Sequence, residues 1–303
     1  AVLPIGLHDD FIQELKAPHH LVTAADVRSI LRERGRFDHK GHFGHALLIA
    51  GNPGKLGAAV LAAEACLRSG PGLLTLSLPP EGIPVLQTAV PEAMVVERPG
   101  DYQFIPVKEL ERYDSIAAGP GLGTGDTTSG ALKFLIQGSS IPLILDADAL
   151  NILGENKTWL AFLPKGSILT PHPKEFERIA GKSSHSFERM QMQKEMSIKY
   201  GVYIILKGAH SCISTPEGHC WFNSTGNPGM ATGGSGDSLT GILAGLMAQG
   251  YSPLETAILG TWVHGFAADL ALEESAWEAL LPSDINGMLG AAFRWLREEV
   301  SEE

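Results

Sequence analysis

Short apolar runs alternate with amphipathic segments from residue 45 onward, and this alternation limits the chain to few folds. Such runs predict strands that are buried on both faces, and the segments between most of them have the spacing of amphipathic helices. This order is typical of a mainly parallel sheet with helices on both faces, so we predict an α/β fold with that architecture. The predicted strands are 45–51 (HALLIAG), 72–79 (GLLTLSLP), 93–97 (AMVVE), 115–119 (SIAAG), 142–148 (PLILDAD), 166–172 (GSILTPH) and 202–208 (VYIILKG).

The remaining segments complete the predicted organisation. Residues 211–223 resemble a hairpin that turns at Pro216 to Gly218, which predicts antiparallel strands near one edge of the sheet. The chain after Gly250 has a mostly helical pattern, and residues 23–35 predict a helix with Thr23 as its N-cap. We predict one large domain over residues 23–303, preceded by a leader or interdomain linker at residues 1–22.

Composition excludes several classes of protein. The charge of 23 − 34 = −11 and the absence of a basic run argue against nucleic acid as a partner. No apolar stretch is long enough to span a membrane, and the first residues lack the pattern of a secretory signal, so we expect a soluble cytoplasmic chain. Three cysteines are too few for a disulfide framework or a zinc site, although Cys212 and Cys220 could face each other across the hairpin.

The glycine-rich segment 226–237 (GNPGMATGGSGD) runs directly into an amphipathic helical pattern. The unpaired N–H groups of a helix start attract anions, and glycines let a phosphate approach the backbone. Asp237 at this point could simply cap the helix. Alternatively, it could act as a general base beside a bound phosphate, because a carboxylate and a phosphate repel each other unless a reacting hydroxyl or a metal lies between them.

Other candidate residues follow the predicted strands, where ligands of open α/β sheets bind. Gly121 belongs to a glycine-rich segment, 117–126, that could lie against a ligand or form a plain turn. His172 and Glu175 could contact a ligand or cap the next helix. Asp146 and Asp148 could bind Mg²⁺ through water or cap a helix, with capping slightly favoured.

Two further segments carry open alternatives. Lys207 ends an apolar strand and needs a negative partner, either a nucleotide phosphate or a carboxylate of the core. Gly57 and Ala58 allow close approach to a ligand, or they serve only the packing of a helix.

Six motifs in this order resemble the ADP/ATP-dependent NAD(P)H-hydrate dehydratase family, a branch of the ribokinase-like fold. They are HKGHFGHALLIAG, AAGPGLG, LDADALN, LTPHPKEF, LKGAH and GNPGMATGGSGDSLTGI, and the resemblance covers residues 23–300. It implies ATP- or ADP-driven repair of hydrated NADH or NADPH. The C6 hydroxyl of the hydrate would first be phosphorylated, and phosphate would then be expelled. Ser235 is a small departure, since threonine is more usual at this position.

The resemblance also implies roles for individual residues. Asp237 would accept the proton of the reacting hydroxyl, and Gly234 to Gly236 would stabilise charge on the transferred phosphate. Asp146 and Glu175 would organise Mg²⁺ through water. The implied substrate contacts are Ala58, Gly121, His172 and Asp237. The implied nucleotide contacts are Lys207, Gly208, Ala209, His210, Ser211, Asn227, Gly233, Gly234, Ser235 and Gly236.

The resemblance further implies a homo-oligomer, a tetramer in this family. Residues 1–22 look like the segment that connects such a dehydratase to an upstream epimerase domain. Two other functions stay open. A ribokinase-like kinase for a thiazole or pyridoxine-type alcohol would use the same glycine–aspartate site, and a non-catalytic nucleotide-binding regulator would retain the fold without needing Asp237.

Overall fold

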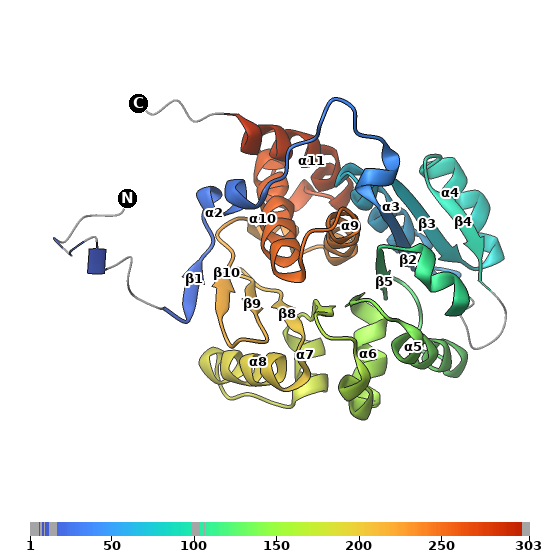
Figure 1. Ribbon diagram of the computed structural model, residues 1–303, viewed down its shortest axis with the longest axis horizontal. Coiled ribbons are helices and arrows are strands. Elements are labelled where there is room, and N and C mark those ends of the chain that lie inside the picture. Colours follow the sequence, from blue (N-terminus) through green and yellow to red (C-terminus); the bar gives the residue numbers. More distant parts are fainter. Residues whose placement is uncertain are drawn as a thin grey trace.

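One mixed sheet runs through the molecule (Figure 1). The computed structural model describes residues 17–98, 104–105 and 107–298, together with Gly6, His8, Asp10 and Phe11. In this part of the chain, ten strands pair in the order β1-β10-β9-β8-β7-β6-β5-β2-β3-β4. Neighbours are parallel from β4 to β8, and β9 is antiparallel to both β8 and β10, so the predicted mainly parallel sheet is confirmed. The strands are β1 His19–Leu21, β2 His45–Ile49, β3 Leu73–Leu78, β4 Met94–Glu97, β5 Ser115–Ala118, β6 Leu143–Leu145, β7 Ile168–Leu169, β8 Tyr203–Leu206, β9 Cys212–Ser214 and β10 Cys220–Phe222.

Helices cover both faces of the sheet, because its central strands bury both of their faces. In β2, Ala46 and Leu48 belong to one hydrophobic cluster, whereas Leu47 and Ile49 belong to the other. Figure 1 shows α3, α9, α10 and α11 on one side and α5, α6, α7 and α8 on the other. The helices are α2 Ala24–Ile30, α3 Leu56–Arg68, α4 Ile83–Ala89, α5 Asp126–Gly138, α6 Ala147–Glu155, α7 Pro173–Ala180, α8 Ser186–Tyr200, α9 Ser235–Ala248, α10 Pro253–Ala271 and α11 Pro282–Arg297.

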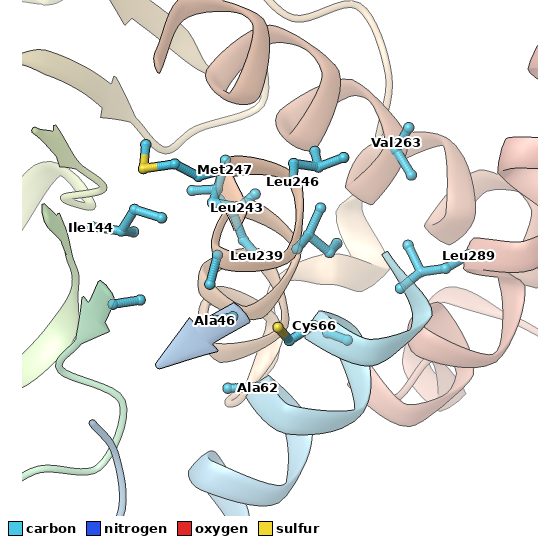
Figure 2. Packing of buried hydrophobic residues seen from close by; sticks show 14 of the residues in the cluster. Ala46, Ala62, Cys66, Ile144, Leu239, Leu243, Leu246, Met247, Val263 and Leu289 are labelled. Carbon is cyan, nitrogen blue, oxygen red and sulfur yellow. The ribbon is translucent and has the colours of Figure 1, made fainter. Parts of the chain in front are cut away.

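Helices α3 and α9 pack unusually closely (Figure 2). A Cβ on Gly241 would lie 2.0 Å from the carbonyl oxygen of Ala62, so no side chain fits at that point. Cys66 of α3 and Leu239 of α9 are buried in the same cluster. The two helices therefore hold each other in register, and both begin at the edge where the parallel strands end.

The predicted hairpin and the helix near the N-terminus are both present. β9 and β10 form the hairpin, and Thr23 caps α2 by accepting a hydrogen bond from Asp26 N at 3.3 Å, although α2 ends at Ile30. Sequence analysis did not predict β1, which pairs with β10 and so joins the end of the proposed linker to the sheet. Apart from Gly6, His8, Asp10, Phe11 and residues 17–22, that linker lies outside the described residues.

Cys66, Cys212 and Cys220 are buried and free of disulfide bonds, and the last two lie on the paired strands β9 and β10. No helix in the described residues combines the length and the apolar character that crossing a bilayer requires.

Candidate active site

A pocket of about 450 Å³ lies at the carboxyl edge of the parallel strands, where an open α/β sheet usually binds its ligands. It is formed by the starts of α3 and α9 and by the segments that follow β5 and β6. Several predicted site residues meet here, although they are far apart in the sequence. The pocket is lined by Gly54, Lys55, Gly57, Ala58, Leu61, Gly121, Ala147, Asp148, Gly233, Gly234 and Asp237.

The first turn of α9 differs from an ordinary capped helix start. Its N-cap is Gly234, which has left-handed backbone angles (φ 98°, ψ −17°) and provides no side-chain cap. A Cβ on Gly234 would lie 2.7 Å from Leu61 Cδ1, so the position excludes larger residues. Asp237 lies in the first turn rather than at the N-cap, so its interpretation as the cap of this helix is wrong.

The carboxylate of Asp237 has no partner among the described residues. Among the described residues it forms neither a hydrogen bond nor an ion pair, and it lines the pocket. Burial raises the pKa of Asp237 to about 7, with the charge of Asp146 adding to the effect and Lys207 opposing it. A carboxyl group with a pKa near neutral pH that faces a pocket is suited to general base catalysis.

A part-buried lysine, Lys207, and a buried carboxylate, Asp146, form an ion pair close enough to act on the pKa of Asp237. Lys207 Nζ lies 2.8 Å from Asp146 Oδ1, and Thr240 donates to Asp146 Oδ2 at 2.9 Å. Burial alone would lower the pKa of Lys207, but Asp146 and Glu175 raise it above its ordinary value. Of the two partners predicted for Lys207, the structure provides the carboxylate. A Cβ on Gly236 would lie 3.2 Å from Lys207 Nζ, which places this ammonium group beside the first turn of α9.

The two carboxylates after β6 are held by groups other than a helix cap. Asp146 has the N-cap position of α6 but forms no side-chain cap, and Asp148 Oδ2 accepts from Gly123 N at 2.8 Å and from Lys55 Nζ at 3.2 Å. The slightly favoured capping role is therefore wrong for Asp146. The intervening Ala147 has a φ of 47°, an unusual value for a residue with a side chain, and it lines the pocket.

His172 and Glu175 cap α7. His172 Nδ1 accepts from Lys174 N at 3.1 Å and from Glu175 N at 3.3 Å, and Glu175 Oε2 accepts from His172 N at 2.8 Å. The capping alternative is thus present for both residues, and neither lines the pocket. In the described part of the chain, Glu175 is connected to the pocket residues through Lys207, whose Nζ lies 4.0 Å away. Burial raises the pKa of Glu175, and Lys207 opposes this shift.

The residues predicted for magnesium fit a direct metal site poorly. Both oxygens of Asp146 already accept hydrogen bonds, and Glu175 is engaged by the start of α7. Within the described ranges, no group of three or more His, Cys, Asp or Glu residues is arranged to hold a metal ion. A metal at this site would therefore contact these carboxylates through water, unless Lys207 moved away.

The predicted nucleotide contacts fall into two groups, with Asn227 apart from both. Gly233, Gly234, Ser235 and Gly236 lie at or beside the first turn of α9, whereas Lys207 to Ser211 follow β8. Gly208, Ala209 and His210 are exposed, and Gly208 N donates to Ser211 Oγ at 3.3 Å. Asn227 lies outside the pocket, where it accepts from Gly229 N at 3.0 Å and donates to Asp269 Oδ1 at 2.9 Å.

Sequence analysis missed several residues of the site. Lys55 and Ala147 line the pocket, and Thr240 binds Asp146. His264 Nε2 lies 3.4 Å from Ser235 Oγ, and burial lowers the pKa of this histidine to about 4. In the sequence, Thr240 and His264 are visible only as polar residues within apolar helices. Their position does not predict which residue of another segment they contact.

Known proteins resemble this chain along most of its length. A family model described as NAD(P)H-hydrate dehydratase matches residues 46–289. The ADP-dependent (S)-NAD(P)H-hydrate dehydratase of Bacillus subtilis is 35% identical over 88% of this chain and 95% of its own length. A crystal structure of the ADP/ATP-dependent NAD(P)H-hydrate dehydratase of Bacillus subtilis, co-crystallised with ATP/Mg²⁺, covers 92% of this chain and 99% of that one, with a TM-score of 0.80 and 31% identity.

A longer relative matches almost the whole chain. The bifunctional NAD(P)H-hydrate repair enzyme of Moorella thermoacetica is 36% identical over 99% of this chain, but the match spans only 58% of that enzyme. The chain therefore corresponds to little more than half of some of the curated proteins that it matches. The ribokinase-like fold predicted from sequence is confirmed by the similarity to the solved dehydratase.

Proposed function

Because the chain belongs to the NAD(P)H-hydrate dehydratase family, we propose that it converts the (S)-hydrates of NADH and NADPH back to NADH and NADPH. ADP or ATP is the second substrate in this proposal. The observation that carries it is Asp237, a partly buried carboxylate with a pKa raised to about 7 that lines the pocket and is not used to cap its helix.

The reaction proceeds in two steps. In the first, the C6 hydroxyl of the hydrate loses its proton to Asp237 as its oxygen attacks the terminal phosphorus of the nucleotide, and the shortened nucleotide leaves. In the second, the lone pair of the ring nitrogen expels phosphate and C5 loses a proton, which restores the dihydropyridine. Phosphorylation is needed because hydroxide is a poor leaving group. The N–H groups of the first turn of α9 stabilise the charge on the transferred phosphate.

The neighbouring residues prepare the site for this transfer. Lys207 lies beside Gly236 and adds positive charge below the phosphate position, while its ion pair with Asp146 fixes its place. Ala58 and Gly121, which also line the pocket, contact the hydrated dinucleotide, and Gly233 to Gly236 contact the nucleotide. Mg²⁺ would neutralise charge on the phosphates, and Asp146 and Glu175 would hold this ion through water molecules. His172 contacts the substrate only through its exposed edge, because its Nδ1 caps α7.

The proposal extends to a second domain with its own activity. Because the match to the Moorella thermoacetica enzyme leaves much of that bifunctional protein uncovered, we propose that an epimerase domain precedes this dehydratase and interconverts the hydrate epimers. The homo-oligomeric assembly and the cytoplasmic location stay predictions.

The test is recovery of the reduced-nicotinamide absorbance when the purified chain is mixed with hydrated NADH, Mg²⁺ and either ADP or ATP. Recovery should require a nucleotide, and recovery without any nucleotide would refute the phosphorylation step. A ribokinase-like kinase would instead phosphorylate its alcohol without restoring absorbance, and an ordinary ATP-dependent kinase would not use ADP. A non-catalytic regulator would bind nucleotide and give no recovery.

A further inference from the structure

A second cavity, of about 490 Å³, lies at the other ends of α3 and α9 from Asp237. Its walls include Ser69 and Gly70 just after α3, Gln249 just after α9, and Gly290 of α11. The segment that follows α2 closes one side, and in Figure 1 this blue connection passes over α11 before the chain enters β2. The residues predicted for the catalytic site are all absent from its lining.

Four arginines line this cavity in a chain whose net charge is −11. Arg32 and Arg68 have acidic partners: Arg32 Nη2 lies 3.4 Å from Glu255 Oε2, and Arg68 Nε lies 3.0 Å from Glu64 Oε1. Arg34 and Arg297 have none within the described residues. Among the residues that the structure describes, no ion pair neutralises their positive charges.

Both of these arginines are anchored by neutral oxygen atoms. Arg34 Nη2 donates to the carbonyl of Gly70 and to Gln249 Oε1, and Arg297 Nη2 donates to the carbonyl of Arg32 at 3.0 Å. A guanidinium carries five N–H donors, so each has donors left after one nitrogen is used. The Arg34 guanidinium also lies 3.9 Å from the centre of the Phe43 ring, which fixes the plane in which its donors lie.

The acidic side chains that line the cavity are fewer than its arginines and do not neutralise their positive charge. They are Glu33 and Asp38. Asp38 accepts hydrogen bonds from Gly35 N and from His42 Nδ1, the latter at 3.0 Å, so its carboxylate is already occupied. Glu33 is exposed, as Arg34 and Arg297 are, so water screens all three charges alike, and the lining holds four arginines against two carboxylates.

We propose that this cavity binds a phosphate-bearing small molecule, as a second ligand site separate from the pocket at Asp237. Planar guanidinium groups pair with phosphate through parallel hydrogen bonds, and Arg34 and Arg297 have donors to offer. Phe43, Tyr251 and Phe293 provide apolar walls for an organic part of the ligand. The volume lies within the range of about 300 to 1,000 Å³ that is usual for small-molecule sites.

Two glycines of α11 allow a matched test. A Cβ added at Gly290 or at Gly287 would meet no atom within 4 Å, both residues are exposed, and only Gly290 lines the cavity. Glutamate is a better helix former than glycine, so neither Gly290→Glu nor Gly287→Glu should lower the melting temperature. Gly290→Glu introduces a negative charge into the cavity, whereas Gly287→Glu adds the same charge to the same helix outside it.

The experiment is a calorimetric titration of the parent chain and both variants with AMP, with adenosine as the probe that lacks phosphate. Any binding of AMP at the catalytic pocket is common to all three proteins and cancels in the comparison. We expect the parent chain and Gly287→Glu to bind AMP at this second site, and Gly290→Glu to lose that binding by about tenfold or more because like charges repel. Adenosine should not bind there in any of the three.

A parallel titration with inorganic phosphate separates two sources of the ligand. Phosphate binding that Gly290→Glu weakens and Gly287→Glu preserves supports the site, and a higher affinity for AMP than for phosphate assigns it to an organic phosphate. Identical AMP titrations for all three folded proteins would overturn the proposal. The same holds if adenosine bound as well as AMP, because the phosphate would then contribute nothing.

Discussion

The start of α9 differs from the other helix starts that carry an acid at the third helical position. In α2, α7, α10 and α11 this acid accepts a hydrogen bond from the N-cap N–H, at 2.8 Å from Asp26 to Thr23, 2.8 Å from Glu175 to His172, 2.7 Å from Glu255 to Ser252 and 2.9 Å from Asp284 to Leu281. In α8 the acid at this position, Glu188, accepts instead from Ser184 N at 2.6 Å. Asp237 has the same position in α9 but makes no such bond to Gly234. The same residue type at the same position therefore stabilises one helix start and is left free at another.

The conformation of the N-cap residue explains the difference. His172 and Ser252 are extended, with φ/ψ of −79°/166° and −60°/159°, which is the usual N-cap geometry. Gly234 is left-handed instead, and among the described residues no hydrogen bond joins its N–H to the third residue of the helix. A partly buried carboxylate without a hydrogen-bond partner at a helix start costs stability, and this cost is acceptable where the carboxylate has a catalytic role.

The comparison predicts the largest effect for Asp237→Asn. If Asp237 is the general base, this variant should lose about 10² to 10⁴-fold in kcat, because general base catalysis typically contributes that much. The measurement is the rate of absorbance recovery with hydrated NADH and ADP, alongside nucleotide affinity by calorimetry. Affinity should change little, and a variant that retained full turnover would remove Asp237 from the mechanism.

The second effect concerns the ion pair between Lys207 and Asp146. Lys207→Met leaves Asp146 buried without its cationic partner, although Thr240 remains, so we expect a loss of about 3 kcal/mol in the free energy of unfolding. Lys207 also lowers the pKa of Asp237, so its removal should shift the rising limb of the pH–rate profile to higher pH. Denaturant unfolding and kcat/KM against pH are the measurements. An unshifted profile in a folded variant would show that Lys207 does not act on the base.

The third prediction uses the pH dependence of stability. The pKa of Asp237 is about 7 in the folded chain against an ordinary value of 3.8, so the unfolded chain loses its proton first as pH rises. The stability associated with this proton is complete below about pH 4 and is lost as pH rises through about 7. Asp237→Asn should therefore melt at a higher temperature than the parent at pH 8, with the advantage vanishing near pH 4. An equal advantage at both pH values would contradict the raised pKa.

Sequence patterns predicted the sheet better than they predicted the site. Hydrophobic periodicity is a local property, so strands such as β2 and the helix after Gly234 could be located from it. Whether Asp237 caps its helix depends on the left-handed backbone of Gly234, and the partner of Lys207 depends on where β6 lies in the sheet. Both are properties of the tertiary structure. β1 was missed for the same reason, because its pairing with β10 joins segments about two hundred residues apart.

The smallest effect is expected for Asp26→Asn, which makes the same chemical change at a capped helix start. Asp26 Oδ2 accepts from Thr23 N at 2.8 Å and from Thr23 Oγ1 at 2.7 Å, and an amide accepts these bonds more weakly than a carboxylate. We expect a loss of about 0.5 to 1 kcal/mol in the free energy of unfolding and unchanged turnover. At pH 8, denaturant unfolding should then show a lower free energy of unfolding for Asp26→Asn and a higher one for Asp237→Asn, each relative to the parent chain. If both variants were destabilised equally, the carboxylate of Asp237 would be supporting its helix as Asp26 does, and the distinction between the two helix starts would fail.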